Sequence, residues 1–336
     1  MNDSITVYGI GNILIDILVR VSEQDIRSLG VARGSMNLTD GQKRDRLLAF
    51  VRSREAVYSC GGSAANATIT LAALGIPAGL SGKIGNDDLG RMYSRRLTEH
   101  GVTSFLSTGE GNTGTSIILI TPDAQRTMNT SLCVNREYSA GDINPEAIAG
   151  ADYFFFTGYM WDTPGQKEAL LRAVEIAEAA GTRIVFDAAD TFAVLRAGEE
   201  FSSLIRDHVD IVLANAGEGK ILTGKIDPEA AAGLLAGLCD IAVIKDGRNG
   251  SCIKSGHDCH RIPAFPVETV DTTGAGDIYA AGLLYGLCRN WDVYRSALFA
   301  SYLAGRIVSV TGAQFSRETT ETIRKAVEDG SWEITR

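Results

Sequence analysis

The segment from residue 210 to residue 245 has the sequence DIVLANAGEGKILTGKIDPEAAAGLLAGLCDIAVIK. Its two ends, DIVLA at 210–214 and IAVIK at 241–245, are short apolar runs typical of buried strands. Between them, helical patterns occur near 218–222 and over 228–239. Strand, helix and strand in this order predict two parallel strands joined by a helical crossover.

The same alternation extends over most of the chain. Further strands are predicted over 4–9, 77–83, 153–157 and 183–187, with a hairpin of 251–254 and 259–262. Helices are predicted over 64–74, 88–99 and 165–180, and the chain is helical from 276 to its end. Continuous apolar strands separated by helices are typical of a parallel sheet covered on both faces. No linker interrupts the pattern, so we expect one α/β domain over residues 1–336.

Two segments fit this alternation less well. Residues 13–60 and 112–131 contain short alternating stretches, such as 115–120 and 126–131, and many polar residues. We expect them to form a small antiparallel lid over one edge of the main sheet. Such lids often close over a substrate and exclude water.

The composition describes an acidic protein. There are 32 Lys and Arg against 41 Asp and Glu, a net charge of −9, which opposes binding to nucleic acid or anionic membranes. Six scattered cysteines and an N-terminus without a basic stretch before an apolar core predict a cytoplasmic protein with reduced thiols. Glycine accounts for 37 of the 336 residues, more than the usual ~7%. This excess indicates backbone positions with positive φ or close contacts.

One local group combines residue types that bind metals, namely Cys252, His257, Cys259 and His260. Its spacing matches no common zinc pattern. Residues 257–260 instead predict the tip and return of a hairpin, and we favour that interpretation over a metal site.

Glycines gather in DTTGAGD, residues 271–277, between an extended segment at 265–270 and an apolar helix at 278–287. Small residues at a helix N-terminus leave backbone N–H groups open to an anion. Asp277 is therefore a candidate general base beside an anion hole formed by Gly274, Ala275 and Gly276. The alternative is a glycine-rich turn in which the aspartate only caps the helix.

Two further motifs suggest a site for hydroxyl groups. In CGGSAAN, residues 60–66, small residues would let a ligand approach the backbone, and Asn66 offers donors and acceptors. The alternative there is tight packing of a helix on a strand. Asn12 and Asp16 follow the first strand and suit vicinal sugar hydroxyls, although an Asx turn would also explain them. Leu14 stands where a dinucleotide fingerprint needs its third glycine.

Two motifs follow later strands. Asn215 and Glu218 could hold the water shell of Mg²⁺, or could simply cap a helix. The turn 246–250 follows Lys245 and could lie beside a nucleotide. A Walker A loop is absent, because Ala214 stands where its first glycine belongs.

The order of these motifs resembles the ribokinase-like (pfkB-type) family of carbohydrate and nucleoside kinases, over about residues 5–328. The series is Gly-Asn with a following Asp, Gly-Gly-Ser-Ala-Ala-Asn, Asn-x-x-Glu, Gly-x-x-Gly and Asp-Thr-Thr-Gly-Ala-Gly-Asp. The resemblance implies a three-layer α/β sandwich with a mostly parallel central sheet and a small β lid. It also implies ATP as the donor and Mg²⁺ as the metal.

The resemblance further implies roles for individual positions. Asp277 would be the catalytic base, and Gly274, Ala275 and Gly276 would supply the amides of the anion hole. Substrate-binding residues would be Asn12, Asp16, Gly61, Gly62, Ser63, Asn66 and Tyr159. Cofactor-binding residues would be Asn215, Glu218, Lys245, Gly247, Gly250, Thr272 and Gly312. Of these, Asn215 and Glu218 would hold Mg²⁺ through water, and the turn at Gly312 could bind a monovalent cation such as K⁺.

Two features are similar to the adenosine-kinase branch. One is the opening VYGIGNILIDI at 7–17. The other is TGT at 113–115, followed by TPDAQR at 121–126. In addition, Tyr159 falls where that branch places an aromatic residue against the purine. We therefore predict ATP- and Mg²⁺-dependent phosphorylation of the primary hydroxyl of a ribosyl acceptor such as adenosine. The alternatives are a kinase for free ribose or a fructose-type sugar, a non-catalytic ligand sensor and, more remotely, a nicotinamide oxidoreductase. Both a monomer and a homodimer are compatible with the sequence.

Overall fold

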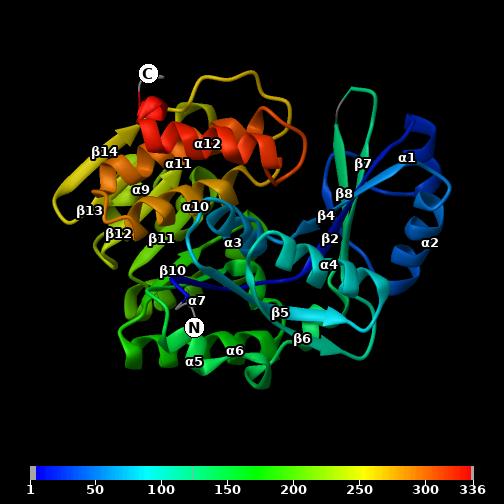
Figure 1. The fold of residues 1–336 in the computed structure, drawn as a ribbon, viewed down its shortest axis with the longest axis horizontal. Coiled ribbons are helices and arrows are strands. Elements are labelled where there is room, and N and C mark those ends of the chain that lie inside the picture. Colours follow the sequence, from blue (N-terminus) through cyan, green and yellow to red (C-terminus); the bar gives the residue numbers. More distant parts are fainter. Residues whose placement is uncertain (1–4, 124, 334–336) are drawn as a thin grey trace.

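The computed structural model describes residues 5–123 and 125–333, and Figure 1 shows its ribbon. The main sheet contains β1 (Val7–Ile10), β5 (Ala78–Gly85), β6 (Thr103–Gly109), β9 (Tyr153–Thr157), β10 (Arg183–Asp187), β11 (Ile211–Asn215), β12 (Ile241–Lys245), β13 (Ser251–Ser255) and β14 (Asp258–Ile262). Their order across the sheet is β14-β13-β12-β11-β10-β9-β1-β5-β6. Neighbouring strands from β6 to β12 are parallel, and only the β12–β13 and β13–β14 pairs of this sheet are antiparallel.

Helices cover both faces of this sheet. One face carries α3 (Ser63–Ala73), α4 (Asp88–Glu99), α10 (Ala275–Cys288), α11 (Val293–Val308) and α12 (Arg317–Asp329). The other carries α5 (Pro145–Ala149), α6 (Pro164–Ala180), α7 (Thr191–His208), α8 (Ala216–Thr223) and α9 (Pro228–Leu235). Phe155 on β9 belongs to the first core, while its neighbours Phe154 and Phe156 belong to the second. Because successive side chains of a strand point to opposite faces, one apolar run serves both cores.

The lid is a second sheet, on the right in Figure 1. It contains β2 (Leu14–Arg20), β3 (Met36–Leu38), β4 (Ala56–Gly61), β7 (Gly114–Ile120) and β8 (Arg126–Ser131), in the order β3-β8-β7-β2-β4. Two helices, α1 (Glu23–Leu29) and α2 (Gly41–Val51), belong to the same part of the chain. Ile15, Ile17 and Val19 on β2 share a buried core with Ile26 of α1 and Leu47 of α2.

The expectation of a purely antiparallel lid is wrong. The pairs β2–β4 and β7–β8 are antiparallel, but β2–β7 and β3–β8 are parallel. Both β2 and β7 are entered from the carboxyl ends of main-sheet strands, β1 and β6, so they run away from the main sheet in the same direction. The two helices were also not foreseen, although Ser22 and Asp40 cap their N-termini.

Other differences concern element boundaries. The first strand begins at Val7, and residue 4 of the predicted strand lies outside the described residues. The helix predicted to reach residue 239 ends at Leu235, close to Gly237, which is consistent with the low helix propensity of glycine. The segment 265–270, predicted to be extended, contains no strand of either sheet. Strand β6 and helix α7 were not predicted, because their polar residues obscure the apolar pattern.

The helical prediction from 276 onward corresponds to α10, α11 and α12 with turns between them, and residues 334–336 lie outside the described residues. The other predicted elements agree with the structure within a few residues, including the strands over 153–157, 183–187 and 241–245. Among the helices of the described residues, none combines the length and the apolar character needed to span a bilayer.

Candidate active site

A large cavity of about 980 Å³ lies between the lid and the carboxyl ends of the main-sheet strands. This volume is within the range of small-molecule sites, about 300–1,000 Å³. The cavity is lined by all the site residues predicted from the sequence except Gly61 and Gly312. The structure therefore brings together motifs that are spread along the whole chain.

The two exceptions each lie against a carboxylate, Asp16 in the cavity lining and Asp271 just outside it. A Cβ atom on Gly61 would lie within 2.5 Å of the Asp16 carboxyl atoms, so only glycine leaves room for that side chain. The Gly312 amide donates a hydrogen bond of 2.6 Å to Asp271 Oδ2. Both glycines act through a neighbouring carboxylate.

Asp277 lies in the first turn of α10, next to three small residues. Gly274, the residue before the helix, has φ 74°, a left-handed conformation that favours glycine. Asn66 Nδ2 donates to Asp277 Oδ2 over 2.8 Å, and the Ser63 hydroxyl donates to Oδ1. Ser63 and Asn66 were predicted to contact the substrate, and here they orient this carboxylate. Burial raises the pKa of Asp277 to about 6, although these two hydrogen bonds act to lower it. Such a carboxylate can accept a proton near neutral pH.

Asp16 and Asn12 approach the cavity from β2 and from the loop before it. Burial and the nearby Asp277 carboxylate raise the pKa of Asp16 to about 7, although Arg126 opposes the shift. The Asn12 amide is fixed by the core: its Nδ2 donates to Tyr159 O over 3.2 Å, and its Oδ1 accepts from Gln166 Nε2 over 2.9 Å. Gln166 has no strong sequence signal, because it occupies an ordinary helix position.

Asn215 and Glu218 form a capping box at the start of α8. Asn215 Oδ1 accepts from the Glu218 amide over 2.9 Å, and Glu218 Oε2 accepts from the Asn215 amide over 2.7 Å. The capping interpretation is thus correct, and both residues also line the cavity. Burial and the neighbouring Asp187 raise the pKa of Glu218 to about 7.

Lys245 forms a buried ion pair at the same edge of the sheet. Its Nζ lies 2.6 Å from Asp187 Oδ2, and the two side chains are 15% and 5% exposed. Asp187 was not singled out from the sequence. Its position was a usable signal, because it ends a parallel strand at the edge where Asn215 and Lys245 end theirs.

The lid is tied directly to the DTTGAGD loop. Arg126 on β8 pairs with Asp271 over 2.5 Å and donates to Thr273 Oγ1 over 2.9 Å. Asp271 also accepts from the amides of Thr273 and Gly312. The lid, the DTTGAGD loop and the turn after α11 are therefore linked through one buried carboxylate.

The walls of the cavity differ in polarity. The inner face of the lid contributes the polar side chains of Asp16, Ser116 and Thr130 and a larger apolar set, namely Leu14, Met36, Leu38, Ile118 and Met128. The acidic lining residues are Asp16, Asp162, Asp187, Asp190, Glu218 and Asp277, and the basic ones are Arg196, Lys245 and Arg248. Because Arg196 is paired with Asp162 and Lys245 with Asp187, the cavity has an excess of carboxylates.

Comparison with known proteins identifies the family of this chain. The pattern of the pfkB family of carbohydrate kinases matches residues 41–320. The chain belongs to this family.

Relatives of this pfkB kinase carry two kinds of name. The 5-dehydro-2-deoxygluconokinase of Shouchella clausii (strain KSM-K16) is 30% identical over 287 residues, which cover 80% of this chain and 86% of that protein. The enzyme of the same name from Bacillus subtilis (strain 168) is 28% identical over 281 residues, with coverage of 80% and 86%. The crystal structure of adenosine kinase from Sinorhizobium meliloti superposes with a TM-score of 0.87 at 33% identity, covering 96% of this chain and 99% of that one.

These findings confirm the ribokinase-like fold and a phosphotransferase that acts on a sugar or nucleoside hydroxyl. Membership of the pfkB family also implies ATP as the phosphoryl donor. The relatives divide between sugar and nucleoside acceptors, so the acceptor has to be argued from the cavity itself.

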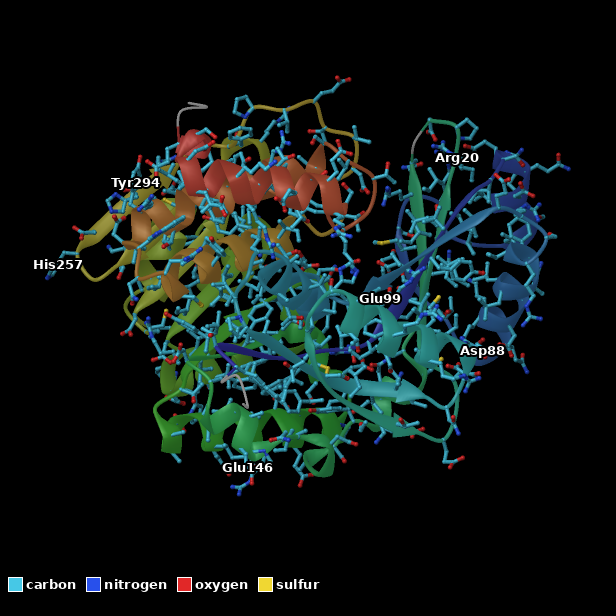
Figure 2. All side chains as sticks on the ribbon, in the orientation of Figure 1. Arg20, Asp88, Glu99, Glu146, His257 and Tyr294 are labelled. Atoms are coloured by element: carbon cyan, nitrogen blue, oxygen red, sulfur yellow. The ribbon has the colours of Figure 1, made fainter. Side chains whose placement is uncertain are left out.

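The residues assigned to Mg²⁺ from the sequence, Asn215 and Glu218, lie at the end of β11 and in the first turn of α8. Within the described residues, no group of three or more His, Cys, Asp or Glu side chains is arranged to hold a metal by itself. The oxygens of Asn215 and Glu218 fit an ion that keeps most of its ligands as water and phosphate, as Mg²⁺ does. The other residues considered for a metal lie outside the cavity lining. Cys252 is buried in the core, and His257 lies at the tip of the β13–β14 hairpin, far from the lid (Figure 2).

Proposed function

We propose that this kinase transfers the γ-phosphoryl group of ATP to the primary hydroxyl of a nucleoside, with adenosine as the first candidate. The observation that carries the proposal is the polarity of the cavity. The lid contributes a cluster of apolar side chains beside the hydroxyl-binding candidate Asp16, and the cavity as a whole has surplus carboxylates. A neutral acceptor with an apolar, aromatic part and several hydroxyls fits such walls best.

The ribose of the acceptor would lie near Asn12 and Asp16, whose oxygens can accept hydrogen bonds from vicinal hydroxyls. The base would contact Leu14, Ile118 and Met128 on the lid, with Tyr159 on the opposite side. An aromatic base gains from burial against such apolar surfaces, by about 25 cal/mol per Å² of apolar area.

A sugar acid fits less well. The acceptor in the name of the Shouchella relative is a gluconate derivative, which carries a carboxylate. The cavity lining holds six acidic side chains against three basic ones, and one of the basic ones, Lys245, lies at the phosphoryl end beside Gly276. A second anion would therefore meet unbalanced carboxylates. A neutral free sugar such as ribose or fructose remains the second candidate, because the hydroxyl-binding residues would serve it equally.

In the proposed reaction, Asp277 accepts the proton of the acceptor hydroxyl as that oxygen attacks the γ-phosphorus. The amides of residues 274–277, at the N-terminus of α10, stabilise the charge on the transferred group. Mg²⁺, held through water by Asn215 and Glu218, would neutralise the charge of the phosphates. Gly247 and Gly250 would shape the turn beside the nucleotide.

No monovalent cation is needed in this proposal, because the Asp271 carboxylate beside Gly312 is already paired with Arg126. A cytoplasmic location, a lack of nucleic-acid and membrane partners, and the choice between monomer and homodimer stay predictions from the sequence.

The test is an ADP-release assay with adenosine, other nucleosides, ribose, fructose and 5-dehydro-2-deoxygluconate. We expect the highest kcat/KM for a nucleoside. The variant Met128→Lys should lower that value at least tenfold, because it places a charge against the base. Val57→Lys puts the same charge on the lid at a side chain that is 67% exposed and outside the cavity lining, and should change nothing. A higher kcat/KM for the sugar acid or a free sugar refutes the nucleoside assignment.

A further inference from the structure

We propose that Lys245 contacts the transferring phosphoryl group directly and that Asp187 positions it for this task. The inference rests on kinase activity and on the proposed anion hole at α10. It does not depend on which acceptor the enzyme uses.

The geometry places the lysine beside the anion hole. Lys245 ends β12 and its partner Asp187 ends β10, with β11 between them. The side chain therefore crosses the end of β11, where Asn215 begins the capping box. A Cβ atom built on Gly276 would have Lys245 Nζ at 3.2 Å, and no other atom outside the local backbone within 4 Å. Apart from this ammonium group, that side of the first turn of α10 is open.

The ammonium group has more hydrogen-bond donors than its present partner uses. The carboxylates of Asp187, Glu218 and Asp277 all act on it electrostatically. Only Asp187 forms a hydrogen bond with Nζ among the described residues. An ammonium group has three N–H donors, so two remain for atoms in the cavity. A phosphoryl group bound at the amides of α10 would have its oxygens within reach of them.

Asp187 is itself held in place. Its Oδ1 accepts from the Ala189 amide over 3.0 Å, while Oδ2 holds Lys245. Ala189 has φ 71°, an uncommon conformation for a residue other than glycine. The turn after β10 thus fixes the carboxylate, which in turn fixes a flexible lysine. Asp187 is a positioning residue, since it reaches the phosphoryl group only through Lys245.

The chemical step assigns the lysine an electrostatic role. The bond from the γ-phosphorus to the β,γ-bridging oxygen breaks, and ADP leaves with the electron pair. The acceptor oxygen bonds to phosphorus, and its proton goes to Asp277. Lys245 keeps its proton throughout and donates hydrogen bonds to the non-bridging oxygens, where charge is spread in the transition state. Loss of one such preorganised donor typically costs about 10²–10³-fold in kcat.

The test compares binding of ADP alone with binding of ADP plus aluminium fluoride, which mimics the transferred group. Calorimetry is done with Mg²⁺ and without acceptor, so an error in the acceptor assignment does not affect it. For Lys245→Met we expect unchanged ADP affinity, at least tenfold weaker binding of the fluoride complex and a kcat about 10²–10³-fold lower. Asp187→Asn should show the same pattern with smaller effects.

The matched control is Lys83→Met. Lys83 forms a comparable buried pair with Asp142, at 3.0 Å and with 13% and 11% exposure, but lies outside the cavity lining. This control should leave both affinities unchanged. If Lys245→Met does not fold, Lys245→Gln keeps a polar end and should show the same selective loss. A variant that weakens ADP and the fluoride complex equally, or neither, overturns the proposal and leaves the lysine a counter-ion. Failure of the wild-type protein to bind ADP would instead contradict the proposed site.

Discussion

Replacing Asp277 by Asn should slow turnover strongly and, at pH 8, make the protein more stable. The variant keeps the shape of the site. Asn66 can donate to the remaining carbonyl oxygen, and the Ser63 hydroxyl can rotate to accept from the new amide. The proton acceptor is lost, however, and positioned base catalysis is worth roughly 10²–10⁴-fold. We expect kcat to fall by at least two orders of magnitude while ATP affinity stays nearly constant.

The gain in stability follows from the pKa of Asp277. Burial raises this pKa from 3.8 to about 6, so the folded state binds the proton more tightly than the unfolded chain does. The stabilisation that this bound proton adds to the folded state is fully present below the unfolded pKa of 3.8, and it is lost as pH rises through about 6. Two pKa units correspond to about 3 kcal/mol. At pH 8 the variant avoids this cost, so its free energy of unfolding should exceed that of the wild type by about 2–3 kcal/mol.

The assay combines kcat from ADP release, ATP binding by calorimetry, and urea unfolding at pH 5.5 and pH 8. The control is Asp142→Asn, which should change the free energy of unfolding in the opposite direction. Burial pushes the pKa of Asp142 up, but hydrogen bonds from Ser107 and Lys83 bring it below its ordinary value. That variant should be less stable than the wild type at both pH values. Unchanged turnover of Asp277→Asn, or a loss of stability at pH 8, would refute the reasoning.

Two further predictions concern the loop beside the lid. Arg126→Met leaves Asp271 buried and unpaired at 1% exposure, so we expect a loss of about 3–5 kcal/mol in urea unfolding together with a lower kcat/KM. The same change at the exposed lid residue Arg20 should be neutral. Equal effects of the two variants would contradict the conclusion that Arg126 ties the lid to the DTTGAGD loop. Gly274→Ala adds about 1–2 kcal/mol of left-handed strain and puts a Cβ atom 2.5 Å from Ala313 Cβ. It should lower both the melting temperature and kcat, and an unchanged kcat would argue against the anion hole.

Local patterns predicted the main sheet well, because its central strands are buried on both faces. Runs such as 153–157 and 241–245 are almost entirely apolar and agree exactly with β9 and β12. The lid was harder to predict. Helix α2 has polar residues over most of its surface, and the parallel pairing of β2 with β7 joins segments about a hundred residues apart. Such pairing depends on where the main sheet delivers each strand, which no local pattern specifies.

In the candidate site, too, some features follow from local sequence and others only from the assembled fold. The sequence by itself determined which groups are present, and it put Asp277 and three small residues at a helix N-terminus, because helix ends and glycine turns are local features. Only the tertiary structure decided their partners: Asn66 with Asp277, Asp187 with Lys245, and Arg126 with Asp271. Parallel strands bring their carboxyl ends to one edge of the sheet, so residues distant in the chain become neighbours there. The pKa values of Asp16, Glu218 and Asp277 follow from that assembly, because burial and nearby charges exist only once the chain has folded.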